Sequence, residues 1–294
     1  VICDDLKTGE KWKNLVKKRF KKIVSRHELF NYLKNESPKF SAVFHLGACS
    51  STTESDASYL LENNTHFSIR LAEYCLSKNI RLIYASSAAT YGDGQLGFSD
   101  DHALLEELVP LNMYGYSKHL FDLWALREGV LDKMTGLKFF NVYGPNENHK
   151  GRMASAITRM LPSIQNEGVV KLFKSSEPDK FRDGEQERDF IYIKDAVNMT
   201  VGLLSHEAYG IFNIGTGKPT RWRELAGAVF RALDMPEKIE FIEMPSDLIG
   251  KYQNTSCAMM TKLQGVLGDG VCCQPMEASV SEYVREYLVE DRRW

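Results

Sequence analysis

The sequence predicts an α/β protein in which a doubly wound parallel sheet carries helices on both faces and a smaller domain follows. Apolar strand-like runs alternate with amphipathic helix-like runs up to about residue 141. Small or polar residues follow these strand-like runs, as they do at the carboxyl edge of such sheets. The alternation breaks after Pro145. We therefore expect one domain over 1–145, with a return segment near 189–217, and a second domain mainly over 146–294.

The composition is that of an ordinary soluble globular protein. The 294 residues are 43% hydrophobic and 26% charged, with a net charge of −2, so nothing indicates a nucleic-acid partner. No apolar run approaches the roughly 18 residues that a membrane helix needs. The six cysteines form no C-x-x-C pair, and we expect free thiols in the cytoplasm. No His or Cys spacing indicates a metal site.

The chain starts with what reads as the end of a buried strand. Residues 1–3 are apolar and are followed by Asp4 and Asp5. In a dinucleotide-binding fold, an acidic residue at this place bonds the ribose hydroxyls. We expect that a first strand, a glycine-rich turn and a helix are missing from this chain before Val1. The alternative is that Asp4 and Asp5 are only a polar terminus.

The next elements continue the alternation. Ser25 and Glu28 have the spacing of a capping box, which predicts a short helix through Leu33. Strands are expected at 42–46 and 81–86, with a small-residue loop at 47–53 and a long amphipathic helix at 58–78 between them.

Residues 92–97 match G-x-G-x-x-G but are not expected to bind a nucleotide. The stretch does not directly close a strand, and it leads into Phe98 and polar residues rather than a helix. The motif has meaning only between a strand and a helix.

The stretch 112–118 contains the main candidate catalytic residues of the chain. Tyr114 and Lys118 are four residues apart, and Asp122 continues the same helical row. A free tyrosine has a pKa near 10, and a nearby ammonium is expected to lower it. Ser87, at the end of an apolar strand, would share the substrate proton with Tyr114. The alternative is an ordinary helix start at which Tyr114 and Lys118 are simply exposed. Tyr116, only two residues before Lys118, would point away from it.

The second half reads less regularly. A strand at 137–145 should break at Gly144, and a polar loop with His149 and Lys150 should open a helix near Ala154. Further expected elements are a charged loop at 174–189, strands at 190–193, 211–217 and 239–242, and helices at 195–204, 221–233, 259–267 and 276–288.

Residues 84–92, 114–118 and 140–145 together resemble the extended short-chain dehydrogenase/reductase superfamily. Its members have a Rossmann-like fold. Four narrower stretches, at 47–54, 149–155, 188–192 and 250–253, are similar to the ADP-L-glycero-D-manno-heptose 6-epimerase family within it. The resemblance covers nearly all of the chain. The chain departs from the family pattern at Leu46, Arg152 and Arg159, the last two on the substrate side.

The resemblance implies roles for individual residues. Catalysis would fall to Tyr114, Lys150, Ser87 and Lys118. Binding of NADP, with NAD possible, would involve Asp4, Asp5, Lys11, Ala48, Cys49, Ser50, Asn63, Tyr114, Lys118 and Val142, with Lys11 suited to a 2′-phosphate. The ADP-sugar would be bound by Ser87, Asn141, Arg152, Phe173, Lys174, Ser175, Ser176, Arg188 and Tyr252.

The function implied is inversion of a heptose at C6 for the inner core of bacterial lipopolysaccharide. Tyr114 would deprotonate the C6 hydroxyl as a nicotinamide takes the hydride, the 6-keto sugar would turn over, and Lys150 would serve the other face. A homo-oligomer is also expected. Two alternatives stay open: another sugar-nucleotide epimerase or dehydratase, and a non-catalytic nucleotide-sugar-binding module.

Overall fold

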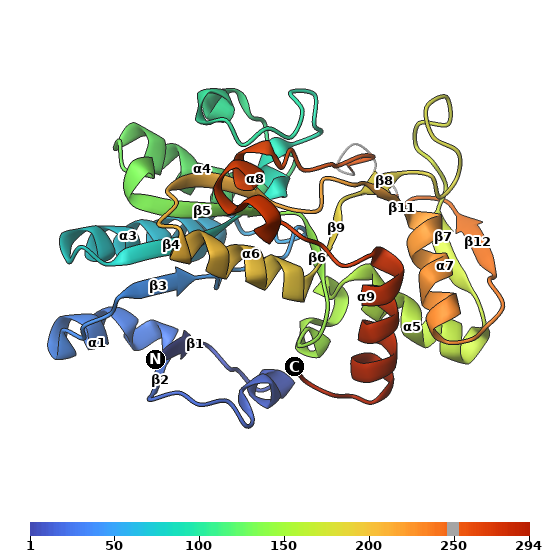
Figure 1. Cartoon of the computed structure of the whole chain (residues 1–294), viewed down its shortest axis with the longest axis horizontal. Helices are drawn as coiled ribbons and strands as arrows, with labels where there is room; N and C mark the ends of the chain where they lie inside the picture. Colours follow the sequence, from blue (N-terminus) through green and yellow to red (C-terminus); the bar gives the residue numbers. More distant parts are fainter. Residues whose placement is uncertain (246–252) are drawn as a thin grey trace.

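The computed structural model describes residues 1–245 and 253–294. Its main sheet has the strand order β10 (Gly210–Ile214), β5 (Met134–Phe139), β4 (Arg81–Ser87), β3 (Ala42–His45), and every neighbouring pair is parallel. Apolar residues on the central strands are fully buried. The expected α/β fold with a parallel sheet is therefore confirmed (Figure 1).

The first strand of the chain lies in a separate two-stranded sheet. β1 (Ile2–Asp4) pairs in parallel with β2 (Ile23–Ser25), a strand that the sequence pattern did not predict, and it does not pair with β3. Between β1 and β2 runs a 3₁₀ segment, η1 (Glu10–Leu15), and after β2 come η2 (Arg26–Glu28) and α1 (Leu29–Glu36). The expectation of a first strand that is missing from this chain stays a prediction.

A long helix connects β3 to β4, as expected, but its hydrogen bonding changes along its length. α2 (Ala57–Leu60) continues into a π-helical segment, η3 (Leu61–His66), and then into α3 (Phe67–Ser77). Asp56 starts it by accepting a hydrogen bond from the Tyr59 N–H at 2.9 Å. Such π segments are frequent at functional sites, and this one buries two asparagines.

The helix of the Y-x-x-x-K motif is α4 (Met113–Arg127). The Asn112 side chain caps it by accepting from the Gly115 N–H at 2.9 Å. The 3₁₀ segments η4 (Ala88–Tyr91) and η5 (His102–Glu107) precede it. The G-x-G-x-x-G stretch between them forms turns rather than a strand-to-helix connection, and its rejection as a nucleotide loop stays a prediction. At Gly92, with a φ of +65°, a Cβ would lie 2.0 Å from the Val109 carbonyl oxygen.

One predicted strand is wrong in detail. The stretch at 137–145 forms two strands, because β5 ends at Phe139 and β6 (Asn141–Tyr143) pairs with β9 (Phe190–Tyr192) outside the main sheet. The Phe140 N–H still bonds Ile214 at 3.0 Å, whereas the Asn141 N–H bonds Asp189 at 3.0 Å. The chain therefore changes partners at Phe140, before the Gly144-Pro145 break.

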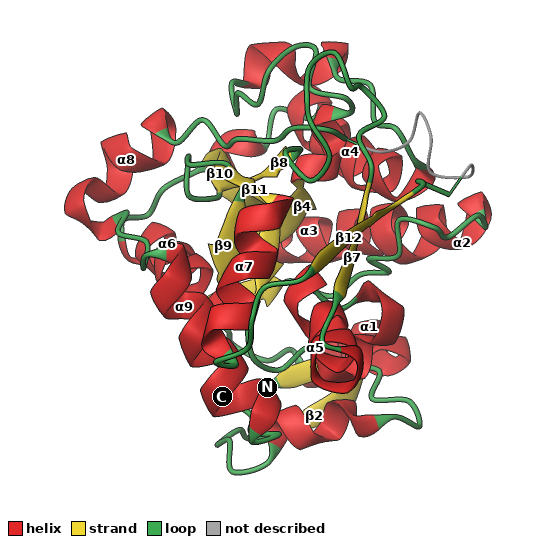
Figure 2. Cartoon of the chain, turned by 90° about the vertical axis from the view of Figure 1, so that its right-hand side faces the viewer, coloured by secondary structure: helices red, strands yellow, loops and turns green. Residues whose placement is uncertain are grey.

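A second buried cluster includes residues of α5, α7 and β7, which Figure 2 shows side by side. β7 (Val170–Phe173), which the sequence pattern missed, pairs in parallel with β12 (Ile239–Ile242). The other elements are η6 (Leu131–Lys133), η7 (Asn148–Met153), α5 (Ala156–Glu167), β8 (Glu187–Arg188), α6 (Ile193–Ser205), β11 (Thr220–Arg221), α7 (Trp222–Ala232), α8 (Thr261–Leu267), η8 (Gly268–Gly270), α9 (Met276–Glu282) and η9 (Tyr283–Val289).

The first buried cluster includes the main sheet and also residues of α6 and α8. The chain thus returns to this cluster twice, the second time with Leu263 and Leu267, outside the expected return segment. The division into domains at residue 145 stays a prediction. In the described ranges, no helix has the length and apolar character to cross a membrane.

Candidate active site

Ser87, Tyr114 and Lys118 come together at the carboxyl end of β4. Ser87 is the last residue of that strand, and the other two lie on successive turns at the start of α4. The Tyr114 and Ser87 side chains are joined by a hydrogen bond. The buried Lys118 Nζ donates to the Ala85 carbonyl oxygen at 2.7 Å. Two proton-bearing hydroxyls and an ammonium thus lie at one strand end, the arrangement expected for proton transfer.

The electrostatics of this group differ from the expectation in one respect. Burial raises the pKa of Tyr114, and the hydrogen bond with Ser87 lowers it only in part. The expected lowering of this pKa by Lys118 is not found, because the Lys118 ammonium is directed at the Ala85 carbonyl. Burial lowers the pKa of Lys118 itself to about 8, and the Asp122 carboxylate opposes that shift. Tyr116 is 44% exposed and separate from the group, as predicted.

The loop after β3 is held against α4 by an asparagine that the sequence reading missed. Asn64 accepts from the Cys49 N–H at 2.9 Å and donates to the Cys49 carbonyl at 3.0 Å. Its amide nitrogen also lies 2.9 Å from the Ser117 hydroxyl. Asn63, which was expected to line a cofactor, bonds Asn64 and Arg26, and its role toward a cofactor stays a prediction. The paired asparagines in an otherwise amphipathic helix were the available signal.

Asp4 and Lys11 form an ion pair of 2.5 Å at the carboxyl end of β1. Asp4 also accepts from the Asp5 N–H at 2.7 Å, and Lys11 reaches the Asp5 carbonyl at 3.3 Å. Both side chains keep about a third of their surface exposed. A carboxylate and an ammonium are therefore available side by side, as binding of a phosphorylated ribose requires.

The segment that carries Lys150 lies beside η1. The Asn14 side chain donates to the Asn146 carbonyl at 2.9 Å and lies 3.4 Å from His149 Nδ1. Lys150 and Arg152 are exposed. Within the described residues, no hydrogen bond joins Lys150 to Ser87, Tyr114 or Lys118. Its expected approach to the reacting carbon stays a prediction.

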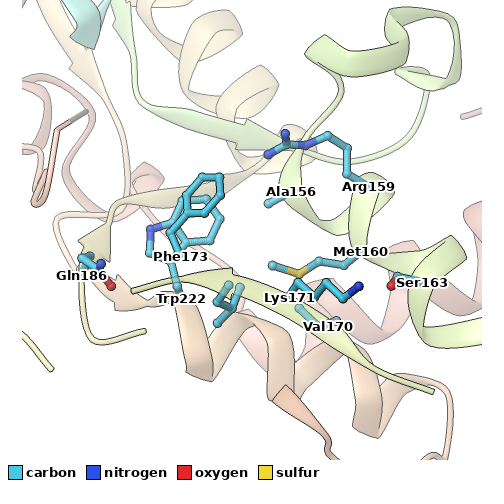
Figure 3. A pocket seen from close by; sticks show the side chains of 10 residues that line it. Ala156, Arg159, Met160, Ser163, Val170, Lys171, Phe173, Gln186 and Trp222 are labelled. Carbon is cyan, nitrogen blue, oxygen red and sulfur yellow. The ribbon is translucent and has the colours of Figure 1, made fainter. Parts of the chain in front are cut away.

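A cavity of about 300 Å³ lies between α5, β7 and the start of α7 (Figure 3). Phe173, expected on the substrate side, lines it. Arg159, also expected on the substrate side, lines it too. The other lining residues were not expected from the sequence: Ala156, Met160, Ser163, Val170, Lys171, Leu172, Gln186 and Trp222. The buried Trp222 Nε1 has no hydrogen-bond partner. An apolar hollow with two cations and an unused donor suits a nucleotide.

The other expected substrate residues are distributed around these two places. Lys174 is held by Glu243 at 2.5 Å, and the Ser175 N–H donates to Asp183 at 2.8 Å. Ser176 bonds Asn254 at 3.4 Å. The remaining members are the buried Arg188 and the exposed Asn141, and the neighbouring Val142, expected on the cofactor side, is partly buried. Tyr252 lies outside the described residues. In the described part of the chain, no cluster of three His, Cys, Asp or Glu residues could hold a metal.

Comparison with known proteins places this geometry in a family. Residues 1–215 match the model of the NAD dependent epimerase/dehydratase family, and the chain belongs to this family.

Two curated relatives are named ADP-L-glycero-D-manno-heptose-6-epimerase. The protein of Nitratidesulfovibrio vulgaris strain DP4 is 53% identical over 291 residues, covering 98% of this chain and 90% of the relative. That of Fusobacterium nucleatum is 44% identical over 303 residues, covering 99% and 91%. The solved structure of the Helicobacter pylori enzyme of the same name superposes with a TM-score of 0.76 at 26% identity, covering 94% of this chain and 81% of that one.

Proposed function

We propose that this protein is an NADP-dependent epimerase that inverts C6 of ADP-D-glycero-D-manno-heptose to the L-glycero form through a transient 6-keto sugar. The product would serve the inner core of lipopolysaccharide. The observation that carries the proposal is the Ser87–Tyr114 hydrogen bond beside Lys118 at the end of β4. The relatives of this name, at 53% and 44% identity over nearly the whole chain, support the choice of substrate.

Tyr114 would take the proton of the C6 hydroxyl, because its phenol is bonded to Ser87 and is only partly exposed. Ser87 would share that proton and orient the sugar hydroxyl toward Tyr114. Lys118 lies one helical turn further on, and its ammonium, which donates to the Ala85 carbonyl, would hold the end of β4 in place beside Tyr114.

Inversion needs the 6-keto sugar to turn, because hydride can return to C6 from one side of the site only. After the turn the carbonyl oxygen would lie near a different group, which must donate the proton that makes the new hydroxyl. Lys150 would be the second group. It comes from a different segment than Tyr114, and its exposed ammonium is unrestrained by an ion pair in the described structure. Glu147 anchors that segment at its two ends.

The residues at β1 and in the loop after β3 fit a nicotinamide dinucleotide. Asp4 would bond ribose hydroxyls and Lys11 a 2′-phosphate, while Cys49 and its neighbours Ala48 and Ser50 form the loop beside Tyr114. The chemistry that such a cofactor supplies when bound is reversible hydride transfer at C6. NAD would also fit, since the Asp4 carboxylate can accept hydrogen bonds from a ribose that carries no 2′-phosphate.

The cavity beside α5 would take the ADP half of the substrate. Figure 3 shows the Arg159 guanidinium extending toward the side of the cavity where Phe173 and Trp222 lie. The aromatic side chains would contact the base, and Arg159 and Lys171 would neutralise the diphosphate. Arg159, a position at which the chain departs from its family pattern, would therefore bind substrate.

The test follows inversion of ADP-heptose at C6 by NMR in the parent and in the variants Tyr114→Phe and Lys150→Met. Each substitution should slow inversion by about 100-fold or more, the usual scale for one acid/base group, with binding of the ADP-sugar retained. Matched controls are Tyr116→Phe and Lys133→Met, both at exposed positions.

A Lys150→Met variant that works at the parent rate would remove Lys150 from the mechanism. A parent protein that ignores ADP-heptose but converts another sugar nucleotide would favour the second candidate, a different epimerase or dehydratase on the same acid/base core. Binding without any turnover would favour a non-catalytic module.

Cytoplasmic location and assembly into a homo-oligomer belong to the same proposal. All six cysteines are free, which agrees with a reducing compartment. Sedimentation velocity of the purified protein would test the assembly.

A further inference from the structure

A fully buried ion pair lies directly behind the acid/base group. The side chains of Asp122 on α4 and Lys138 on β5 are both 0% exposed, and Lys138 Nζ lies 3.1 Å from Asp122 Oδ2. Burying two charges costs several kcal/mol of desolvation, and apolar residues of similar volume often serve stability as well or better. A contribution to stability alone therefore does not explain why this pair is buried.

The Asp122 carboxylate holds the strand that supports Lys118. Its two oxygens accept hydrogen bonds from the Tyr84 hydroxyl at 3.0 Å and the Ser86 hydroxyl at 2.6 Å. These two residues flank Ala85, whose carbonyl accepts from Lys118. Because alternate side chains of a strand share one face, Asp122 fixes the strand on both sides of that acceptor.

Lys138 continues the network to Ser87. Its ammonium lies 2.5 Å from the Thr90 hydroxyl, and that hydroxyl donates to the Ser87 carbonyl at 2.8 Å. The ammonium also lies 4.7 Å from the centre of the Tyr91 ring. Both ends of the ion pair are thus connected to strand positions that carry the acid/base group.

Few ionisable groups share this interior with Lys118. The His45 imidazole on β3 is neutral, because burial and then Lys118 lower its pKa to about 3. Burial also keeps the pKa of Lys118 low, at about 8, and Asp122 is the group that raises it. Other ionisable groups on the surrounding elements include Tyr114 and His119 on α4, Tyr84 and Arg81 on β4, Tyr91 on η4, Lys138 on β5, Asp100 and Cys49 in loops, and His102 on η5, with Tyr116 and Arg127 on the outer face of α4.

We propose that Asp122, balanced by Lys138, is a positioning residue that keeps Lys118 protonated and directed at the end of β4 during the proposed epimerisation. Asp122 attracts a proton to Lys118, and Lys138 limits that attraction. The two residues set the charge of Lys118 by opposite contributions, and neither touches the substrate. The catalytic part of this inference rests on the proposed function.

The two residues should therefore shift the titration of Lys118 in opposite directions. Asp122→Asn removes a negative charge that raises the pKa of Lys118, so that pKa should fall. Lys138→Met removes a positive charge, so that pKa should rise. The double variant should lie closer to the parent than either single variant does.

The titration can be read without any activity. Lysine labelled with ¹³C reports its own protonation through the ε-carbon shift, and Lys118→Met identifies the relevant signal. If the single variants do not fold because one buried charge is left unpaired, the double variant Asp122→Asn/Lys138→Met, which leaves neither charge unpaired, is compared with the parent. The Asp122 contribution should then appear as a lower Lys118 pKa in the double variant.

The activity arm uses the pH dependence of kcat for C6 inversion. Because protonated Lys118 is the active form, the alkaline loss of activity should move to lower pH in Asp122→Asn and to higher pH in Lys138→Met. Shifts in unfolding midpoint alone, with the Lys118 titration unmoved in every variant, would make the pair purely structural and overturn the inference. Failure of the parent to invert ADP-heptose would reject the proposed function while the NMR titration still decides the electrostatic part.

Discussion

At the scale of single residues, Lys11 offers the sharpest test of cofactor choice. Its ammonium is held by Asp4 at 2.5 Å and is one-third exposed, so a phosphate on the ribose could reach it. Lys11→Ala should weaken the binding of NADP by roughly tenfold or more, the scale of one charge-assisted hydrogen bond. The affinity for NAD should stay nearly unchanged. Isothermal titration with each cofactor measures both constants.

The matched control is Lys13→Ala, two positions further along η1, whose side chain pairs with Glu10 at 2.6 Å. It should affect both cofactors little. An equal loss of affinity for NADP and for NAD in the Lys11 variant would show that Lys11 does not recognise the 2′-phosphate.

Residue spacing predicted part of the candidate site. The i, i+4 relation of Tyr114 and Lys118 on a helix, and the place of Ser87 at a strand end, follow from local periodicity, and the structure has both. The pKa of Tyr114 could not be predicted from spacing, because burial depends on the whole surrounding core. Asn64 and Trp222 were missed for the same reason: the residues around them come from segments far apart in the sequence.

At the scale of elements, Glu147 closes the segment that carries Lys150. This buried carboxylate accepts from the Ser155 N–H at 2.7 Å, the Thr158 hydroxyl at 2.8 Å and the Tyr283 hydroxyl at 2.7 Å. Glu147→Ala would leave those donors without their acceptor. The free energy of unfolding should fall by roughly 2–4 kcal/mol, since hydrogen bonds to a charged group contribute most when buried.

Urea unfolding followed by circular dichroism measures this loss. Glu167→Ala, at the exposed end of α5, is the control and should change stability by less than about 0.5 kcal/mol. A Glu147 variant as stable as this control would show that the segment is held by other contacts.

The elements that the sequence pattern missed are short and depend on distant partners. β2 and β7 each need a parallel strand from another part of the chain, Ile23 beside Ile2 and Val170 beside Ile239. Conversely, the long run at 137–145 looked like one strand because its apolar pattern continues through Phe140. The switch of hydrogen-bond partner there, from Ile214 to Asp189, is a tertiary event.

At the scale of the whole molecule, stability should depend on pH through two buried histidines. Burial lowers the pKa of His45 to about 3 and that of His119 to about 4. In the unfolded chain a histidine takes up its proton near pH 6.5, so the unfolded state binds more protons below that value. Stability should therefore fall as pH falls below about 6.5, by roughly 2 kcal/mol from His45 between pH 7 and pH 5.

Denaturant titrations across this range measure the slope. His45→Asn should flatten it, although it also alters the hydrogen bond of 2.8 Å to Ser68. His27→Asn, at an exposed position, should leave the slope unchanged. A parent protein equally stable at pH 5 and pH 7 would contradict the buried, neutral state of His45.

The Asp122–Lys138 pair also constrains how the gene can change. Loss of either charge alone strands the other in the interior, at a cost of about 3–5 kcal/mol, much of the margin of a typical fold. Neutral residues at these positions are accessible only when both codons change, or when a stabilising substitution elsewhere comes first. Lineages that keep one of the two charges should therefore keep the other, and the pair should be inherited as a unit.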